Sequence, residues 1–341
     1  ATRYGGPIYS VHGLCKALVD NGCDVHVYTT NVDGPGNSDV PLGQPVDMDG
    51  VSVWYFPSTV LRRLYWSPEL RKKLDRSVTE FDMVHLHSVF LWPTWAAARA
   101  ARKWHVPYTV SPRGMLVRDL VRRKNRLIKQ LWIKAIEKKN LEAAAFVHVT
   151  AEVEMLELSK FPFRLKRMVN IPNGVDEPQG NHAAGLNSDV DDAIGQSPYV
   201  LFLGRLSWKK GLDRLLSVWH KDLGYRLVIA GNDEENYLDE LQAKYCLTED
   251  NGIRVIPRGV DGNDKEALYE NASLFVLPSY SENFGNTVLE AMMHGTPVLV
   301  TEEVGAAEVV KAAGAGMVVK AAELQVALET MIDNPKALKA M

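Results

Sequence analysis

Short apolar runs alternate with helical patterns along nearly the whole chain, and this alternation constrains the fold more than any other feature of the sequence. The expected strands of the first half cover residues 25–29, 51–56, 83–87, 108–110, 146–149 and 168–171, and those of the second half cover 199–203, 226–230, 253–256, 274–277, 297–300 and 317–319. Helical stretches such as 7–21, 93–104, 116–143, 264–272 and 288–294 lie between them. Fully apolar strands separated by helices are typical of parallel sheets covered on both faces. Two such sets predict an α/β fold with two doubly wound domains.

The two sets are joined by residues 177–198 (EPQGNHAAGLNSDVDDAIGQSP), which are poor in large apolar side chains and rich in Gly, Asn, Asp and Pro. This composition predicts a linker, with a first domain over 1–176 and a second over 199–341. Charge divides at the same place, because residues 1–176 carry 25 Lys and Arg against 17 Asp and Glu, whereas residues 177–341 carry 14 against 25. A net charge of +8 beside one of −11 indicates domains with different partners.

The compartment follows from cysteine use and hydropathy. Three cysteines without a CxxC pair argue against a disulfide framework or a zinc ribbon, so we expect a cytoplasmic protein. We expect neither a signal peptide nor a membrane span, since no apolar run approaches ~18 residues. The chain starts before any expected strand and stops just after a helical stretch, so we expect segments to be missing at both ends.

One group of polar residues follows the strand at 199–203. In open parallel sheets, ligands bind outside the carboxyl ends of the strands. The segment 204–211 (GRLSWKKG) combines glycines with Arg205 and Lys210 and precedes a helix, whose first N–H groups are free to bind an anion. It predicts a phosphate site, and the alternative is a solvated turn with ordinary surface cations.

A second group follows the strand at 274–277. Glu282 lies in the loop 278–287 (PSYSENFGNT), and Glu290 lies eight positions later, about one turn into the next helix. Both carboxylates can face one crevice, and paired hydroxyls of a sugar or ribose are natural ligands for them. Alternatively, Glu290 compensates the helix dipole and Glu282 is a loop carboxylate in water.

The first half offers softer signals. His85 and His87 share one face of a strand, and His87, at its carboxyl end, is the better candidate for a binding cleft, although a strand histidine is usually a core residue. Arg113 follows the next strand, and Gly5 and Gly6 precede the first helix, where they could cradle an anion.

Two Asp-x-Asp triplets are candidate metal sites. Asp47-Met48-Asp49 precedes an expected strand and Asp189-Val190-Asp191 lies in the expected linker, so neither follows an apolar strand. We interpret both as solvated turns and expect no metal and no cofactor.

Together these segments resemble the retaining glycosyltransferases of family 4, also called group 1, which have the GT-B fold. The resemblance rests on GGPIYSVHGLCKALVDNGCDVHVYTT, DMVHLH, SPRGML, HVTAEVEMLEL, IPNGVD, GRLSWKKGL and SENFGNTVLEAMMHGTPVLVT, which span nearly the whole chain. It implies two Rossmann-like domains facing across a cleft, with the donor nucleotide mostly on the second. The chain departs from the family by lacking a first strand before Gly5-Gly6 and final helices that cross back.

By resemblance, the catalytic residues are Glu282, His87, Arg205 and Lys210. Arg205 and Lys210 also bind the donor diphosphate, Glu290 takes the ribose hydroxyls, and Arg258 and Gly259 hold the nucleobase. The remaining donor-binding residues are Gly6, Asn283, Phe284, Gly285, Asn286 and Thr287, and Arg113 lies on the acceptor side. The implied activity is a metal-independent, retaining transfer of a hexose-type sugar from a nucleotide-diphosphate sugar to a glycan or lipid-linked acceptor.

The kind of acceptor is suggested by residues 99–140, which contain 13 Lys and Arg but only two acidic residues, Asp119 and Glu137. With apolar residues at roughly helical spacing, this is typical of a helix that docks on an anionic cytoplasmic membrane; the alternative is a helix packed on its own sheet with a solvated basic face. No nucleic-acid-binding module is recognised. A nicotinamide-dependent dehydrogenase fits poorly because no GxGxxG opens either half. A catalytically silent GT-B protein that binds a nucleotide sugar or acts as a scaffold is the other reading.

Overall fold

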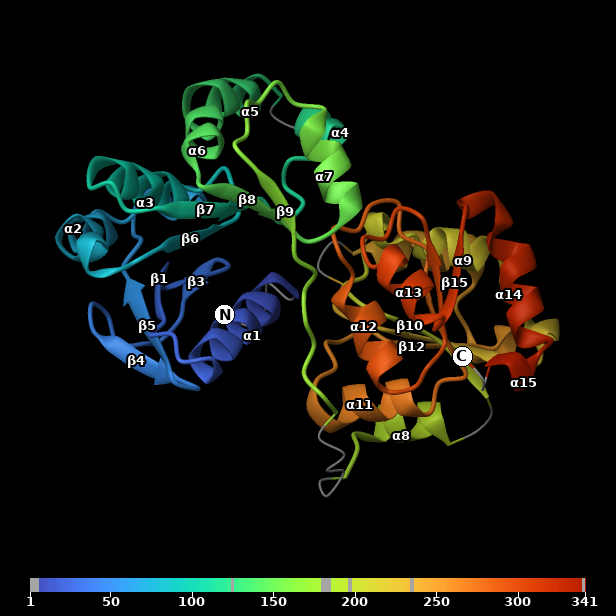
Figure 1. Cartoon of the computed structure of the whole chain (residues 1–341). Coiled ribbons are helices and arrows are strands. Elements are labelled where there is room, and N and C mark those ends of the chain that lie inside the picture. The colour runs from blue at the N-terminus through green and yellow to red at the C-terminus, as the bar shows by residue number, and fades with distance from the viewer. Residues whose placement is uncertain (1–5, 124–125, 179–184, 196–197, 234–235, 339–340) are drawn as a thin grey trace. The chain divides into compact units, whose positions relative to one another are not determined.

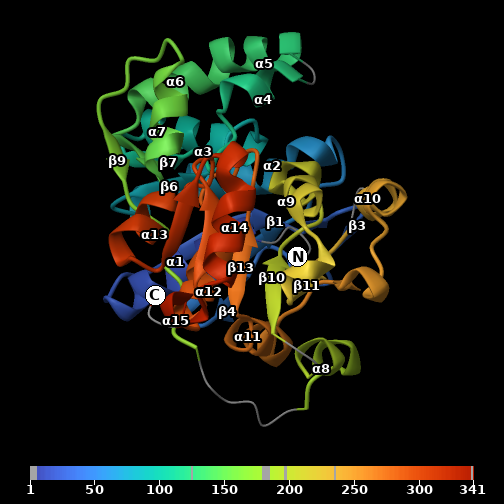
Figure 2. The same cartoon turned by 90° about the vertical axis from the view of Figure 1, so that its right-hand side faces the viewer.

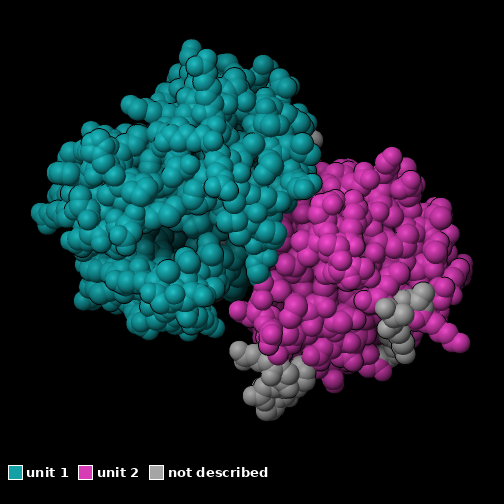
Figure 3. Space-filling view, viewed as in Figure 1, with its two compact units in different colours: residues 1–174 teal, residues 175–341 magenta. Residues whose placement is uncertain are grey.

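The chain divides into two compact units, residues 1–174 and 175–341, in a computed structural model that describes residues 6–123, 126–178, 185–195, 198–233, 236–338 and 341 (Figure 3). The division lies close to the predicted end of the first domain at 176. Each unit has its own hydrophobic core and is described by itself.

The second unit contains one six-stranded parallel sheet in the order β12-β11-β10-β13-β14-β15 (Figure 1). Its strands are β10 (Tyr199–Leu203), β11 (Arg226–Ala230), β12 (Ile253–Ile256), β13 (Leu274–Leu277), β14 (Val298–Thr301) and β15 (Gly316–Val319). The six strands predicted for this half are confirmed to within one residue at each end. The order reverses between β10 and β13, which is where a doubly wound sheet binds its ligands.

The helices of this unit are α9 (Leu212–Val218), α10 (Tyr237–Tyr245), α11 (Gly262–Glu270), α12 (Asn286–Met293), α13 (Ala307–Ala313), α14 (Leu324–Ile332) and α15 (Pro335–Leu338). Right-handed crossovers place α9 and α10 on one face of the sheet and α11 to α13 on the other. Contacts of α9 with α10 and α14, and of α11 with α12, agree with this arrangement (Figures 1 and 2). Strands β10 and β13 are buried along their whole length, because helices cover both faces.

The expected linker is wrong in one part. Residues Ser188–Ile194 form helix α8, in which Val190 and Ala193 are fully buried in the core of the second unit. Asp189, interpreted as part of a solvated turn, therefore lies on a packed helix. The physical reason is that two small apolar residues three positions apart suffice to dock a short helix, although the flanking residues are polar.

The first unit contains β1 (His26–Thr30), β5 (Val51–Phe56), β6 (Val84–His87), β7 (Tyr108–Ser111), β8 (Phe146–Val149) and β9 (Met168–Asn170), which confirm the six strands predicted for this half. Strands β6-β7-β8-β9 form a parallel sheet, and β1 and β5 pair in parallel in a second sheet. Its helices include α1 (Gly6–Asp20), α2 (Pro68–Ser77), α3 (Trp92–Lys103) and α7 (Glu152–Ser159).

Three short strands of this unit were not predicted. β4 (Pro45–Met48) pairs antiparallel with β5, and β2 (Val32–Asp33) pairs with β3 (Gly36–Asn37). Asp49 and Gly50, with φ of 53° and 79°, form the tight turn between β4 and β5, so the first Asp-x-Asp triplet lies at a hairpin.

The predicted helix over 116–143 is interrupted in the described residues. It comprises α4 (Arg118–Arg123), α5 (Arg126–Trp132), a π-helical turn (Ile133–Glu137) and α6 (Lys138–Ala143). The buried carboxylate of Glu137 accepts hydrogen bonds from Phe90 N at 2.7 Å and from Trp132 Nε1 at 2.8 Å. Burial raises the pKa of Glu137, although these hydrogen bonds oppose the rise. The wide turn thus lets the helix place an acidic side chain inside the unit.

Candidate functional site

Most of the predicted site residues of the second unit lie at the carboxyl edge of its sheet, defined as the loops that follow β10, β11, β12 and β13. Lys210 and Glu282 are brought together there, and Lys210 Nζ forms an ion pair with Glu282 Oε2. Their side chains are only 16% and 18% exposed. Arg205 lies on the same loop as Lys210 and is exposed to solvent. The edge therefore presents two cations and a carboxylate from loops 72 residues apart in the chain.

Glycines allow these loops to approach one another closely. A Cβ at Gly231 would lie 1.8 Å from Gly204 O, and a Cβ at Gly211 would lie 2.0 Å from Pro278 O. Gly211 also has a φ of 69°, which favours glycine. The backbones after β10 and β11, and after β10 and β13, consequently touch without intervening side chains.

The loop that carries Glu282 is fixed by the loop after β14. Glu282 N donates to Glu303 O at 3.1 Å, and Gly305 N donates to Glu282 O at 3.0 Å. Phe284 is buried, and its carbonyl accepts from Ala306 N at 2.7 Å. Position and orientation of the Glu282 backbone are therefore set before any ligand arrives.

Helix α12 begins at the end of this loop. Gly285 precedes it with a φ of 94°, and Asn286 and Thr287 form its first turn. Asn283 lies two residues before Gly285 on the same loop. Thr287 Oγ1 is buried and has no hydrogen-bond partner among the described residues. Since the first N–H groups of a helix have no partner within the helix, this terminus offers donors to an anion.

Glu290 lies on α12, with its side chain 25% exposed. Tyr269 Oη donates to Glu290 Oε2 at 3.0 Å, and Lys265 Nζ lies 3.4 Å from Glu290 Oε1. Sequence reasoning missed Tyr269, because a tyrosine near the end of an amphipathic helix is indistinguishable from an ordinary core residue.

Arg258 and Gly259 follow β12. Arg258 makes a bidentate pair with Asp189 of α8, in which Nε donates to Oδ2 at 2.9 Å and Nη2 donates to Oδ1 at 2.7 Å. Arg258 Nη2 also donates to Asp264 Oδ2 at 2.8 Å. Hydrogen bonds from these carboxylates raise the pKa of Arg258, and the Arg258 contact lowers the pKa of Asp189. Gly259 N donates to Asn232 Oδ1 at 2.6 Å. The guanidinium is held by acidic partners, and Asp189, in the expected linker, is the partner that sequence reasoning misjudged.

The predicted residues of the first unit gather at the carboxyl ends of β6 and β7. Arg113 Nε and Nη2 lie 3.4 and 3.3 Å from His87 Nδ1, and Arg113 Nη1 donates to Asn173 Oδ1 at 2.7 Å. A guanidinium can only donate, so His87 Nδ1 accepts and the ring proton lies on Nε2. Asn173 lies in the IPNGVD segment, which the resemblance included without assigning its residues a role.

Two further histidines adjoin His87. The ring centroids of His85 and His87 are 4.0 Å apart. His148 Nδ1 lies 3.4 Å from His85 Nε2. Burial, followed by the positive charge of its neighbours, lowers the pKa of His87 well below 6.5 and that of His85 to about 3. The group is therefore neutral near pH 7.

Gly6 is the first residue of α1, and Gly5 lies outside the described residues. Over the described part of the chain, no group of three or more His, Cys, Asp or Glu side chains is arranged to hold a metal ion. The helices described there are also too short or too polar to cross a bilayer.

Comparison with known families assigns both halves of the chain. Residues 5–174 match the glycosyl transferase 4-like domain, and residues 188–341 match the glycosyl transferases group 1 family. The two matches leave residues 1–4 and 175–187 unassigned. The chain belongs to the group 1 glycosyltransferases, as the sequence motifs predicted.

Individual relatives agree with this assignment. An uncharacterized glycosyltransferase of Methanocaldococcus jannaschii is 26% identical over 90% of this chain and 79% of its own length. Sucrose-phosphate synthase from Thermosynechococcus elongatus is similar in structure, with a TM-score of 0.75, 20% identity, and coverage of 98% of this chain and 86% of its own. HepE of Anabaena in complex with UDP-glucose has a TM-score of 0.62 at 18% identity, covering 85% of this chain and 79% of its own. These likenesses confirm the GT-B class of the fold.

Proposed function

We propose that this glycosyltransferase transfers a hexose-type sugar from a nucleotide-diphosphate sugar with retention of configuration and without a metal ion. The observation that carries the proposal is the carboxyl edge of the second unit, where Lys210, Arg205 and the first turn of α12 meet Glu282. Similarity to HepE, which binds UDP-glucose, supports a nucleotide sugar as donor.

The charges suit departure of a diphosphate. In the proposed reaction the bond between sugar C1 and the diphosphate oxygen breaks, and an acceptor hydroxyl forms the new bond from the same face of the ring. The acceptor proton passes to the departing phosphate oxygen. Arg205, Lys210 and the α12 terminus stabilise the negative charge that develops on that oxygen, which is the role a metal has in other transferases. Glu282 contacts the sugar without forming a covalent bond.

Donor binding must rearrange one interaction. Lys210 and Glu282 pair with each other, so a diphosphate that takes Lys210 frees Glu282 to accept hydroxyls of the transferred sugar. We also propose that the backbone of Asn283, Phe284 and Gly285 surrounds the transferred sugar. Arg258 and Gly259 follow β12, which β11 separates from β10, and we propose that the nucleobase binds there. For the first unit, the family resemblance assigns Gly6 and His87 to donor binding and Arg113 to the acceptor side.

The test is a panel of UDP-, GDP- and ADP-sugars, assayed first by thermal shift and then for turnover with and without EDTA. We expect one class of nucleotide sugar to be a substrate, with the same turnover rate in the presence and absence of EDTA. Arg205→Ala and Lys210→Ala should each lower kcat at least about a hundredfold, as for loss of a charged contact to the transition state. Lys221→Ala is the matched control, because Lys221 lies in a similar glycine-capped turn on the surface.

The outcomes distinguish an active glycosyltransferase from a protein of the same fold that only binds a nucleotide sugar. A strict requirement for a divalent metal, or wild-type rates in both variants, contradicts the proposed mechanism. A thermal shift with a nucleotide sugar but no product with any acceptor favours the silent, binding-only protein instead.

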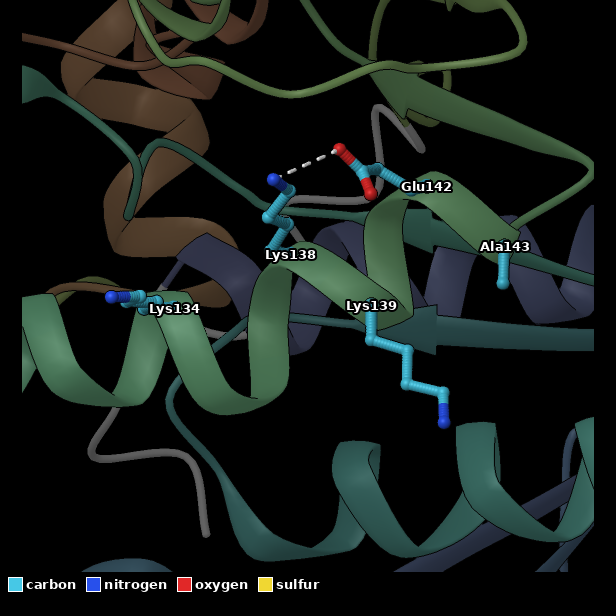
Figure 4. A pocket seen from close by; sticks show the side chains of 5 residues that line it. All are labelled: Lys134, Lys138, Lys139, Glu142 and Ala143. Carbon is cyan, nitrogen blue, oxygen red and sulfur yellow. Dashed lines mark ion pairs between the residues drawn. The ribbon is translucent and has the colours of Figure 1, made fainter.

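We further propose that the acceptor is a glycan or lipid-linked molecule reached from an anionic membrane on the cytoplasmic side. Helix α5 exposes three apolar side chains, Leu127, Ile128 and Leu131, at 79%, 68% and 68%. Arg126 beside them is exposed as well. The following turns form a shallow hollow of about 360 Å³ that is lined by Lys134, Lys138 and Lys139 (Figure 4). Within it, Lys138 Nζ lies 4.0 Å from Glu142 Oε1. Lys124 of the same basic segment lies outside the described residues.

Figure 4 shows the three lysine side chains pointing in different directions, which suits a diffuse anionic surface better than one bound phosphate. Apolar side chains beside cations are typical of interfacial helices. The chain should therefore sediment with vesicles containing an anionic lipid, and about 0.5 M salt should release it by screening. Replacing Leu127, Ile128 and Leu131 by Ser should abolish sedimentation, whereas Leu156→Ser, at a position 64% exposed on α7, should not. No binding at low salt contradicts the proposal.

A further inference from the structure

Helix α11 presents two hydrogen-bond donors to Glu290. Lys265 and Tyr269 are four residues apart on α11 and therefore lie on one face of it. Tyr269 Oη is 3.0 Å from Glu290 Oε2, and Lys265 Nζ is 3.4 Å from Glu290 Oε1. Each oxygen of the carboxylate thus has its own partner from the neighbouring helix.

The Tyr269 contact is the more rigid of the two. Tyr269 is fully buried, and its ring stacks on His294 with 5.4 Å between centroids. Burial, followed by the negative charge of Glu290, raises the pKa of Tyr269 well above its ordinary value. The phenol therefore keeps its proton and can only donate to the carboxylate. His294 is the C-terminal capping residue of α12, and its Nδ1 lies 2.7 Å from the Glu290 carbonyl oxygen, which fixes the imidazole on which Tyr269 stacks.

This arrangement leaves acceptor capacity on both carboxylate oxygens. Each oxygen of an ionised carboxylate can accept about two hydrogen bonds. Tyr269 uses one on Oε2, and Lys265 forms an ion pair with Oε1. The remaining lone pairs suit two hydroxyls on adjacent carbons, as in the 2′,3′-diol of a ribose. A carboxylate held by only one partner can rotate and would present one oxygen at a time.

We infer that Tyr269 and Lys265 are positioning residues that orient the Glu290 carboxylate for two adjacent hydroxyls, so that the site selects ribonucleotides over 2′-deoxyribonucleotides. The inference rests on the proposed function, in which Glu290 binds the ribose. Tyr269 itself is too deeply buried to touch a nucleotide and acts through Glu290.

The experiment measures this selection by calorimetric titration of the full chain with UDP, GDP and ADP and with their 2′-deoxy counterparts. For the base that binds, we expect the wild type to prefer the ribonucleotide about tenfold, as for a hydrogen bond to a charged group. Tyr269→Phe keeps the ring and its stacking on His294, and should reduce the preference to about twofold or less. Affinity for the 2′-deoxynucleotide should fall less than affinity for the ribonucleotide, because the deoxy ligand keeps only the 3′-hydroxyl as a partner for Glu290.

Tyr199→Phe is the matched control. Tyr199 is also fully buried in the second unit, and its hydroxyl donates to Leu268 O at 2.7 Å, so the variant loses a buried hydrogen bond of the same kind. We expect it to keep the tenfold preference. Lys265→Met, at a side chain 31% exposed, should reduce the preference about threefold and replaces Tyr269→Phe if that variant does not fold.

Each other result overturns the inference in a distinguishable way. If Tyr269→Phe and Lys265→Met keep the wild-type preference, Glu290 does not need them for orientation. If Tyr269→Phe weakens both nucleotides equally, Tyr269 is only structural. If the wild type binds both nucleotides equally, the proposed ribose contact of Glu290 fails, and the inference fails with it.

Discussion

Gly211 is the residue on which the spacing of Lys210 and Glu282 depends. It ends the short turn Trp208–Lys210, and a Cβ there would lie 2.0 Å from Pro278 O. Pro278 begins the loop that carries Glu282, so the two loops are in direct backbone contact at this point. A side chain at 211 would force them apart and break the alignment of the ion pair.

We therefore expect Gly211→Ala to be more destabilising than its backbone conformation alone explains. Gly224 is the matched control, because it caps a similar turn with a φ of 73° and nothing within 4 Å of its Cβ position. Gly224→Ala should cost about 1–2 kcal/mol, the strain of left-handed backbone, and Gly211→Ala about 1–3 kcal/mol more, from the forced shift of packed backbone. Urea unfolding of both variants measures the difference, and equal losses would show that the loops part freely.

Sequence reasoning selected Lys210, Glu282 and Glu290 from their positions after apolar strands. The structure pairs Lys210 with Glu282 at the carboxyl edge and places Glu290 on α12, against α11. Sequence reasoning could not predict the partners, because a contact such as that of Lys210 with Glu282 depends on how loops 72 residues apart fold back. Tyr269 was missed for the same reason: nothing local distinguishes a tyrosine that supports a carboxylate from one that fills a core.

Among the elements, α8 has a larger role than its composition suggests. It docks on the second unit through Val190 and Ala193 and supplies Asp189 to Arg258. Asn187, the residue before the helix, donates to Asp264 from its backbone N at 3.0 Å and from its side chain at 2.6 Å. Helix α8 thus fixes both acidic partners of Arg258.

If α8 is an integral part of the second unit, Val190→Ala should destabilise that unit by about 2 kcal/mol, the cost of removing buried methyl groups. Val326→Ala is the control, since Val326 is also helical but 66% exposed, and it should change stability by less than about 0.5 kcal/mol. Circular dichroism during chemical unfolding measures both. Equal effects would indicate that α8 is only a loosely attached linker segment.

The accuracy of the strand predictions varies with burial. β10 and β13 are apolar throughout because they are buried on both faces, and such runs are recognised without knowing their partners. β4 has only four residues, starts with a proline and is mostly exposed, so it depends on pairing with β5 rather than on its own pattern. Helix α8 was missed because its helical signal is only seven residues long.

At the level of the whole chain, the contrast in charge follows the two compact units. Residues 1–174 carry 25 Lys and Arg against 16 Asp and Glu, and residues 175–341 carry 14 against 26. The proposed donor is an anion that would bind the acidic unit, so Lys210 and Arg205 would attract it locally rather than as part of a generally positive surface. The basic unit holds its excess largely in 99–140, the segment proposed to face a membrane.

Nucleotide binding should consequently protect the two units unequally. A nucleotide at about a hundred times its Kd stabilises the folded state by about 2.7 kcal/mol. We expect slower amide hydrogen exchange in β10, β13 and the first turn of α12, with smaller changes in β7 and β8. Mass spectrometry of peptides from the intact chain measures both, and inorganic phosphate at the same concentration is the control. Protection confined to the first unit would contradict the placement of the donor site.

The close backbone approaches also divide the second unit into positions that can and cannot be varied in protein engineering. Gly231 and Gly211 leave no room for any other side chain, since a Cβ at either would overlap a carbonyl oxygen. A library that aims to change donor choice should hold these two glycines constant and vary exposed loop positions instead, because other residues at the two crossing points would yield unfolded protein.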